Sequence, residues 1–538
     1  MLCRRLRDHR SRCIVLHIRD DRQCWSCVCR YRVAYSRRHT MLELRVRFFS
    51  VANSRLIPLQ DLPYPLACVI VALSSFICFI HSLSGDFVFD DAEAIVNNND
   101  VRQDSPLSNL FRNDFWGMRL THPSSHKSYR PLTVLSFRFN YMWGGLDPVS
   151  YHAVNIILHC VVSVMSLRIF YIVFGSSCPR AAMLSAVLFA THPIHTEAVS
   201  GIVGRADLLC ALLVFVALLS YVRAVKALDY IYQEKGRPLN RSSSGWYCLA
   251  CLLLTSTSTA LAMLCKEVGI TALGVCSAYD VLLANGGIIG RIITMAVLGD
   301  KQRATLIWRN LPDIFSRMLV MTHPLIASKR RQIVCSLFWV KSSQKRLMKN
   351  DGPKGFMADF FDCIFDSIYE FSIFLNFSMP SFSCLNESRF FYMECPYIEK
   401  HIFSDPRILA IPVLWLLFGL LLRRGFSQGG QTARSVLMGL ALAVVPFLPA
   451  MNLFFRVGFV IAERVLYLPS AGFCILVVTG MRELGAAGYI NKRALQLCYL
   501  SLVALFVFRC QQRTQDWLTE KQLFHSGLHV CPLNAKVH

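Results

Sequence analysis

The sequence predicts an all-α, polytopic membrane protein, a helical bundle of about 9–12 transmembrane helices. Hydrophobic residues make up 54% of the 538 residues and charged residues only 17%, and the mean hydropathy is +0.41. Several apolar runs approach the roughly 20 residues that a helix needs to cross a bilayer. In such a chain the main core forms where helices pack against each other in lipid.

The apolar runs define the expected spans. The first covers 65–83, and the stretch that follows it, 84–150, is long, polar and rich in aromatic residues. Later spans are expected at 152–174, 181–196, 206–225, 246–264, 267–285, 407–423, 435–455, 457–480 and 494–509.

Positive charge is unevenly distributed along the chain. Residues 1–60 hold 14 arginines, no lysine and four acidic residues, which accounts for +10 of the net charge of +23, and the loop 226–245 adds two lysines and two arginines. Because basic loops stay in the cytosol, we expect the N-terminus and this loop to be cytosolic. The loop 84–150 and the C-terminal tail are then lumenal. Orientation in the membrane accounts for the basic excess, so we expect no nucleic-acid partner.

Residues 1–60 show neither a periodic apolar pattern nor a signal peptide before the first span. They are a basic cytosolic arm or an artefact of the gene model with Met41 as the true initiator, and we favour the second interpretation. The 22 cysteines show no metal-ligand spacing, and no disulfide framework follows from them.

The stretch 85–98, GDFVFDDAEAIVNN, follows directly on the first apolar run and carries two adjacent carboxylates, Asp90 and Asp91. Acids at the mouth of a membrane span are costly there and tend to be functional. The structural alternative is a solvated pair that caps a helix. Adjacent like charges resist joint ionisation, so we expect one of the two carboxyls to have a raised pKa.

The rest of the loop 84–150 contains two patterns. Residues 106–116 have the spacing of an amphipathic helix on the membrane surface. Residues 125–138, SHKSYRPLTVLSFR, set Lys127, Arg130 and Arg138 around Tyr129.

Further motifs lie in short loops and near span ends. They are THPIHTEAVSGIVGRAD at 191–207, CKEVGIT at 265–271 and AERVLYLPS at 462–470. The tail 516–538 places apolar side chains at helical spacing before a proline-containing turn.

In this order the motifs resemble those of the transmembrane and tetratricopeptide-repeat O-mannosyltransferases (the TMTC family), polytopic glycosyltransferases of the GT-C class. Among the branches of that family the chain looks most similar to the fourth vertebrate paralogue. The resemblance covers about 64–300 and 404–538 of the sequence.

The resemblance implies a division into domains. A GT-C-like transmembrane domain covers 64–300, with 84–150 as its first lumenal loop, and further transmembrane helices cover 404–510. Residues 511–538 are similar to the first helix of a lumenal tetratricopeptide-repeat array, which we expect to be truncated because about three repeats are needed for stability. Residues 301–403 match poorly, and we interpret them as a retained intron or mis-spliced sequence.

The resemblance also implies an activity. Family members transfer mannose from dolichyl-phosphate mannose to Ser or Thr hydroxyls of secretory-pathway proteins, cadherin-like domains among them, in the endoplasmic-reticulum membrane. An acceptor hydroxyl needs a carboxylate base within hydrogen-bond reach. The leaving lipid phosphate needs cations more than a proton donor. A single inverting displacement therefore requires one base and one basic cradle.

The motifs supply both parts. Asp90 is the expected base, since it aligns with the first acid of the pair in GT-C enzymes, and Asp91 orients it or binds a divalent metal. Arg130, Lys266 and Arg464 are the expected cradle for the donor phosphate. The other expected site residues position substrate or loops, and they are Lys127, Tyr129, His192, His195, Glu197, Arg205, Asp207, Glu267, Glu463 and Tyr467.

Structural alternatives stay open for the charged residues. Arg130 and Arg138 could be interfacial anchors that reach to lipid headgroups. Lys266 could pair with Glu267, and Glu463 with Arg464. Arg205 and Asp207 could tether their loop.

The spacing of His192, His195 and Glu197 is H-x-x-H-x-E, which differs from the H-E-x-x-H of zinc hydrolases. We therefore favour a lumen-facing polar patch that contacts donor or acceptor over a zinc site, with structural hydrogen bonding as the alternative.

Two other classes of function remain. A non-catalytic membrane scaffold would bind partner proteins through the repeats and keep the acid pair as a vestige. A transporter would show paired broken helices with acids in mid-span, whereas these acids lie in loops. Mannose transfer to a Ser- or Thr-bearing acceptor discriminates the enzyme from both.

Overall fold

The computed structural model describes residues 62–233, 241–284, 410–427, 429–451 and 462–530. All of them belong to the second of two units into which the chain divides, Leu59–His538. The predictions for residues 1–60 and 301–403 lie outside the described residues.

The described residues are helical and contain no strand, only an isolated bridge between Asn113 and Arg119. Within them, seven helical segments are long and apolar enough to cross a membrane. The predicted all-α polytopic membrane class is therefore confirmed. The segments are Tyr64–Ser84, Pro148–Phe174, Ile202–Ala227, Trp246–Cys265, Glu267–Ala284, Gln431–Ala450 and Lys492–Asp516.

Eight α-helices lie in the described residues before position 285. They are α2 (Tyr64–Phe79), α3 (Pro131–Gly144), α4 (Pro148–Phe174), α5 (Pro179–Ala190), α6 (Thr196–Ser200), α7 (Arg205–Gln233), α8 (Arg241–Cys265) and α9 (Thr271–Tyr279). After the gap in the description come α15 (Ala410–Ser427), α16 (Gln431–Val444), α17 (Pro469–Ala486), α18 (Lys492–Asp516) and α19 (Glu520–Val530).

Two predicted spans are wrong in extent. The span expected at 181–196 is the short helix Pro179–Ala190, because Pro193 cannot continue a helix and a 3₁₀ turn, Pro193–His195, follows. The helix expected from 457 begins only at Pro469, after the 3₁₀ turn Glu463–Leu466. Arg464 therefore lies in a turn at the mouth of a helix and not inside one.

The amphipathic helix expected at 106–116 is also absent. A 3₁₀ turn, Leu107–Phe111, takes its place. The Asp114 carboxylate accepts hydrogen bonds from the backbone N–H groups of Trp116 and Met118, and these bonds bend the chain. Phe115 is buried in a small core that the loop forms with Tyr151, Ile202 and Val203.

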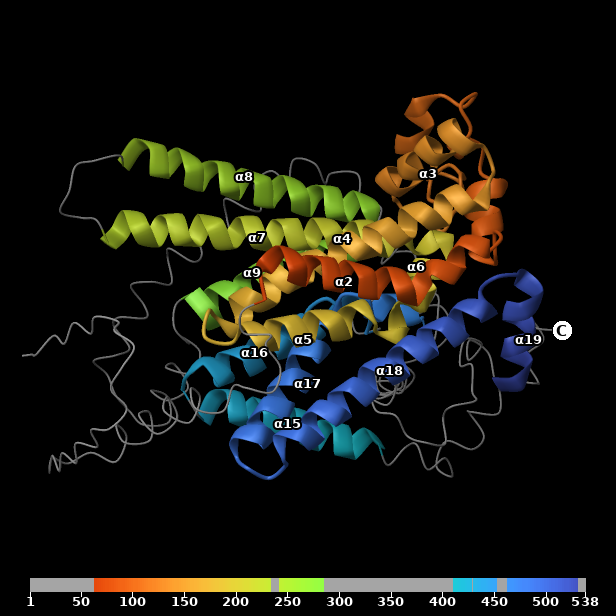
Figure 1. The fold of residues 1–538 in the computed structure, drawn as a ribbon. Coiled ribbons are helices and arrows are strands. Elements are labelled where there is room, and N and C mark those ends of the chain that lie inside the picture. Colours follow the sequence, from red (N-terminus) through yellow and green to blue (C-terminus); the bar gives the residue numbers. More distant parts are fainter. Residues whose placement is uncertain (1–61, 234–240, 285–409, 428, 452–461, 531–538) are drawn as a thin grey trace, which may run out of the picture. The chain divides into compact units, whose positions relative to one another are not determined.

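Two hydrophobic cores hold the elements that carry the site. The larger one joins α2, α4, α5, α7, α16, α17 and α18, and α7 and α8 lie side by side along their length (Figure 1). The smaller one packs the loop 84–150 against Tyr151 of α4 and against Ile202 and Val203 just before α7. The loop is thereby pinned to the end of the α7–α8 hairpin where α7 begins and α8 ends.

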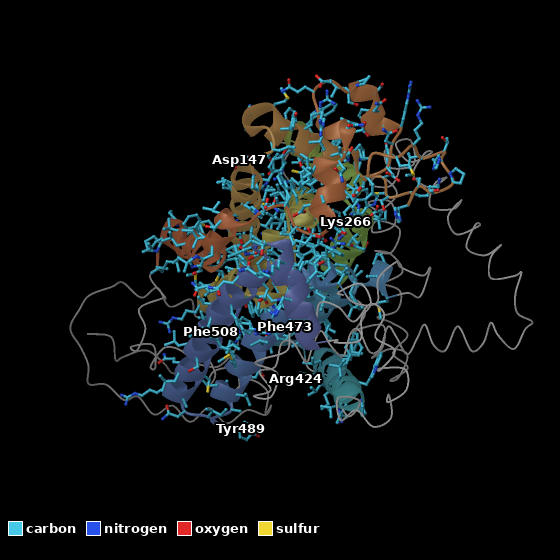
Figure 2. The ribbon with its side chains drawn as sticks, turned by 90° about the vertical axis from the view of Figure 1, so that its right-hand side faces the viewer. Asp147, Lys266, Arg424, Phe473, Tyr489 and Phe508 are labelled. Atoms are coloured by element: carbon cyan, nitrogen blue, oxygen red, sulfur yellow. The ribbon has the colours of Figure 1, made fainter. Side chains whose placement is uncertain are left out.

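We call the end of the α7–α8 hairpin where α7 begins and α8 ends the Lys266 end, because Lys266 directly follows α8. Lys266 and Asp147 lie in the upper part of Figure 2, and Arg424 and Tyr489 lie in its lower part. The expected site residues belong to the Lys266 end.

Candidate functional site

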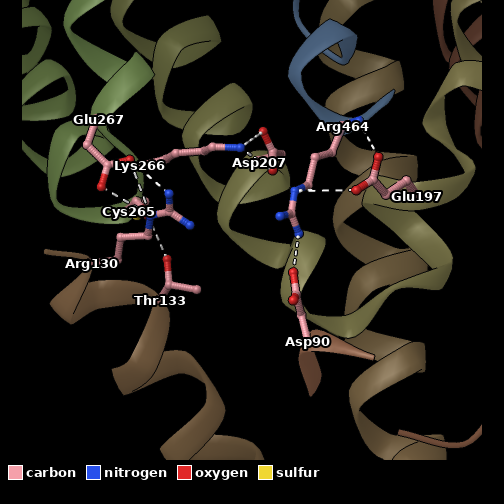
Figure 3. Close-up of polar contacts among 9 residues, drawn as sticks. All are labelled: Asp90, Arg130, Thr133, Glu197, Asp207, Cys265, Lys266, Glu267 and Arg464. Atoms are coloured by element: carbon pink, nitrogen blue, oxygen red, sulfur yellow. Dashed lines mark hydrogen bonds and ion pairs between the residues drawn. The ribbon is translucent and has the colours of Figure 1, made fainter. Parts of the chain in front are cut away.

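Acidic and basic side chains from six separate segments meet at the Lys266 end (Figure 3). Each segment is a turn, a short helix or a helix end. The side chains are Asp90 after α2, Arg130 directly before α3, Glu197 in α6, Asp207 in the first turn of α7, Lys266 and Glu267 after α8, and Arg464 before α17.

Arg464 joins two carboxylates. Its Nη1 lies 3.1 Å from Asp90 Oδ2 and its Nε lies 3.4 Å from Glu197 Oε1. Its backbone N–H also donates to Glu197 Oε2 at 2.8 Å. About a quarter of the Asp90 and Arg464 side chains is exposed (23% and 24%), so a ligand can reach both.

Glu197 is the buried member of this group. Burial raises the pKa of its carboxyl to about 7, although the charge of Arg464 opposes the rise. The expected alternative pair between Glu463 and Arg464 does not form. Glu463 lies instead 3.9 Å from Arg513 of α18.

The two other expected cradle cations are paired as well. Lys266 Nζ donates to both oxygens of Asp207 at 2.6 and 2.7 Å. Arg130 Nη2 lies 3.0 Å from Glu267 Oε2, and its guanidinium lies over the Phe115 ring at 5.1 Å. The alternative pair between Lys266 and Glu267 is therefore wrong.

A hydrogen bond between helices sets the place of Arg130. Thr133 Oγ1, in the first turn of α3, donates to the carbonyl of Cys265 at the end of α8 at 2.9 Å. This bond brings the start of α3 beside Lys266 and Glu267 (Figure 3). Arg130 is thus held among protein groups rather than reaching out to a headgroup.

Asp91 binds backbone groups rather than a cation. The residue is 2% exposed, and its carboxylate accepts hydrogen bonds from the backbone N–H groups of Val88, Ile202 and Val203 at 3.1, 3.3 and 2.8 Å. Burial raises its pKa to about 7 against these hydrogen bonds, and the charge of Asp90 is the smallest contribution. A raised pKa in the pair was expected, but the main cause is burial and not like-charge repulsion.

This arrangement does not fit a divalent metal on the two aspartates. The oxygens of Asp91 are engaged by backbone N–H groups, and Asp90 is paired with a cation. Among the described residues no group of three or more His, Cys, Asp or Glu side chains is placed to hold a metal ion.

The backbone just before Asp90 is strained. Phe89 has a φ of 57°, a left-handed conformation that bulky residues rarely adopt. Such a residue costs of order 1–3 kcal/mol and persists only where the surrounding structure enforces it. The direction of the Asp90 side chain depends on this conformation.

Arg205 ties the loop to the bundle. It is fully buried, and its guanidinium donates to Asn155 Oδ1 at 2.8 Å and to the Tyr151 carbonyl at 2.9 Å. It also lies over the Phe137 ring at 4.8 Å. Arg205 thus acts as a tether, whereas Asp207 is a partner of Lys266.

The two histidines belong to the core and not to a lumen-facing patch. His195 Nε2 lies 2.8 Å from Ser470 Oγ, and its ring lies 4.4 Å from that of Tyr467. His192 packs between Phe473 and Phe506. The patch prediction is wrong because the 3₁₀ turn at Pro193 directs both rings inward. Of His192, His195 and Glu197, only Glu197 reaches the site.

The cations of 125–138 other than Arg130 hold the loop together. Lys127 Nζ donates to the carbonyls of Leu120 and His122, both at 2.6 Å. Arg138 is buried and donates to the carbonyls of Asp100, Gln103 and Ser105. Tyr129, which lies between these two residues in the sequence, is half-buried. The headgroup role considered for Arg138 is therefore wrong.

The sequence is similar to those of several known proteins. The chain is 39% identical to human protein O-mannosyl-transferase TMTC4 over 508 residues, which cover 90% of this chain and 64% of the relative. It is 37% identical to mouse TMTC3 over 461 residues, 86% of this chain and 47% of the relative. It is 36% identical to human TMTC1 over 492 residues, 88% of this chain and 52% of the relative.

The chain therefore spans about two thirds of the length of TMTC4 and about half that of TMTC3 and TMTC1. No family model matches the sequence. No solved structure matches it either.

Proposed function

We propose that the chain is a member of the TMTC family, with higher identity to TMTC4 than to TMTC3 or TMTC1, and that it is a protein O-mannosyltransferase. It transfers mannose from dolichyl-phosphate mannose to Ser or Thr hydroxyls of secretory-pathway proteins, cadherin-like domains among them. The membrane is that of the endoplasmic reticulum, and the Lys266 end of the bundle faces its lumen.

The ion pair between Asp90 and Arg464 carries the proposal. It puts a carboxylate and a guanidinium 3.1 Å apart at the mouth of the spans, where a lipid-linked donor presents its phosphate. A carboxylate within hydrogen-bond reach of an acceptor hydroxyl is the group that takes its proton. Arg464 offers forked donors that match a phosphate.

When the donor binds, its phosphate replaces Asp90 as a partner of the Arg464 guanidinium. The hydrogen bond from the Arg464 backbone N–H to Glu197 keeps the turn in place during this exchange. Asp90 is then free to accept the proton of the acceptor hydroxyl. The hydroxyl oxygen attacks the anomeric carbon, the bond from that carbon to phosphate breaks, and the configuration inverts.

Lys266 and Arg130 extend the cradle. Asp207 lies between Lys266 and Arg464 (Figure 3), so these cations share one band of alternating charge. A phosphate that enters this band contacts three cations, and protein carboxylates already hold each of them in place. Developing negative charge on the leaving phosphate is stabilised by such preorganised cations.

The test is mannosyl transfer in microsomes with labelled dolichyl-phosphate mannose and a Ser/Thr-rich acceptor. Asp90→Asn keeps the size of the side chain but removes the base, so we expect a rate lower by at least about a hundredfold with unchanged donor binding and membrane insertion. Asp86→Asn is the matched control, since Asp86 is an exposed carboxylate of the same segment.

Activity that survives in Asp90→Asn excludes this residue as the base. An inactive wild-type chain, tested against several acceptors, favours the non-catalytic scaffold instead.

A further inference from the structure

The corner where α18 meets α19 contacts three segments that carry or adjoin residues of the candidate site. We define the α18–α19 corner as residues 513–524. The sequence did not predict these contacts, because two of the three segments lie more than 300 positions earlier in the chain and share no pattern with the corner.

The first contact of the corner is with the segment that carries Asp90. The Asp86 backbone N–H donates to the Leu518 carbonyl at 2.9 Å. Val88 is buried against Trp517 and Leu523.

The same contact reaches the strained residue itself. The rings of Phe89 and Phe524 meet edge to face with centroids 6.2 Å apart. Phe89 is the left-handed residue next to Asp90. The corner therefore packs on the residue whose conformation directs the candidate base.

The second contact is with the turn that holds Asp91. Trp517 packs on Gly201 so closely that a Cβ there would lie 3.1 Å from its ring. Ser200 Oγ donates to Thr514 Oγ1 at 3.5 Å. Gly201 directly precedes Ile202 and Val203, whose N–H groups bind Asp91.

The third contact is with the turn that carries Arg464. Arg513 Nη2 lies 3.9 Å from Glu463 Oε1, and both side chains are buried. Arg513 Nη1 also lies 3.1 Å from Asp516 Oδ2. Glu463 directly precedes Arg464, so the corner holds both partners of the Asp90–Arg464 pair.

We propose that the α18–α19 corner positions Asp90 and Arg464 for mannosyl transfer, with Trp517 and Phe524 as its positioning residues. The inference rests on the proposed function and assigns a catalytic contribution to the first repeat-like helix. None of these side chains touches a reacting atom. Their effect passes through Phe89, Gly201 and Glu463.

The physical reason is the sensitivity of a transfer reaction to geometry. A misplacement of about 1 Å costs up to a hundredfold in rate even when it originates far from the chemistry. Phe89 keeps its left-handed backbone only while packing enforces it. Loss of the Phe524 ring removes part of that packing, and Asp90 is then no longer held toward the acceptor.

The experiment compares Phe524→Ala, Phe524→Leu and Lys521→Ala in microsomes containing the full chain. Phe524→Ala should lower kcat for mannosyl transfer by about tenfold or more, with the KM for dolichyl-phosphate mannose and the thermal unfolding temperature unchanged. Phe524→Leu restores apolar contact and should keep kcat within about twofold of wild type. Lys521 is exposed on the same helix, and Lys521→Ala should match wild type.

Phe89→Gly provides a second route if Phe524→Ala does not fold. Glycine adopts the left-handed conformation without strain, so the chain should fold while the ring contact is lost, and kcat should fall as in Phe524→Ala. Wild-type kcat in either folded variant overturns the inference and leaves the proposed function standing. A wild-type chain that transfers no mannose overturns both.

Discussion

Arg464 is held at three points, by the Asp90 carboxylate and by Glu197 through both its side chain and its backbone N–H. Lysine at this position keeps the charge but cannot bridge two acids with forked geometry. We expect Arg464→Ala to raise the KM for the lipid donor by about tenfold or more, and Arg464→Lys to raise it much less. Donor saturation curves in microsomes measure both effects.

Arg424 supplies the matched control for this prediction. It pairs with Glu483 and lies in the lower part of Figure 2, apart from Lys266, so Arg424→Ala should leave the donor KM unchanged. Equal donor saturation in wild type, Arg464→Ala and Arg464→Lys would make Arg464 a structural partner of Glu197 and no more.

Asp91 makes the stability of the chain depend on pH. Burial raises the pKa of its carboxyl from 3.8 to about 7. Between these values the folded chain binds more protons than the unfolded chain, so the free energy of unfolding falls as pH rises through this window. The contribution is at most roughly 4 kcal/mol. Glu197, whose pKa is also raised to about 7, acts in the same direction.

We therefore expect the thermal unfolding temperature in detergent to fall between about pH 5 and pH 8, and Asp91→Asn to show a shallower slope. At the acid end Asp91→Asn should be less stable than wild type, because an amide satisfies fewer of the three backbone N–H groups. Asp86→Asn, at an exposed acid, should keep the wild-type slope. A slope in Asp91→Asn as steep as in wild type would contradict the assignment.

At the scale of the elements, α16 and α17 approach closely at Gly472. A Cβ at this position would collide with the backbone of Gly439 and Ala443 in α16. Backbone cannot move aside as a flexible side chain does, so Gly472→Ala should destabilise the chain by about 1–3 kcal/mol. The turn with Arg464 leads directly into α17, and we expect the donor KM to rise with the displacement of this helix.

Gly480 is the control for Gly472 in the same helix. Nothing lies within 4 Å of a Cβ at Gly480, so Gly480→Ala should be neutral or should stabilise α17 by about 0.5–1 kcal/mol through its helix propensity. Thermal unfolding in detergent compares the two variants. Equal unfolding temperatures would show that α16 and α17 are not in backbone contact at Gly472.

At the scale of the whole molecule, α7 is long enough to connect the site with the opposite side of the membrane. The helix has 29 residues and so rises about 43 Å, more than the roughly 30 Å of a bilayer core. Asp207 lies in its first turn, and the helix ends at Gln233, beyond the predicted start of the loop 226–245 and seven positions before Asn240. If the site is lumenal, Asn240, in an Asn-Arg-Ser sequence, is cytosolic and should carry no glycan.

The measurement is the gel shift on peptide-N-glycosidase treatment. Phe111→Thr places an Asn-Leu-Thr sequence at Asn109 in the loop 84–150 and should create a glycan, because Phe111 is exposed there. A glycan on Asn240 would invert the topology and remove the assignment of Asp90 to lumenal chemistry.

The sequence alone determined the class of the protein and the regions of interest. Long apolar runs have few folded alternatives in lipid, because every backbone polar group there must be satisfied within a helix. The first span, expected at 65–83, is Tyr64–Ser84 in the structure. Asp90 was conspicuous for the same reason, as an acid at the mouth of a span.

The tertiary structure decided which charges pair and which side chains face inward. Lys266 takes Asp207 rather than its neighbour Glu267, and Arg464 takes Asp90 from 374 positions away rather than its neighbour Glu463. Side chains adjacent in sequence point in different directions, so a partner is set by which span ends meet in space. Which span ends meet depends on how the helices pack over the whole bundle, and no local pattern of residues encodes this packing.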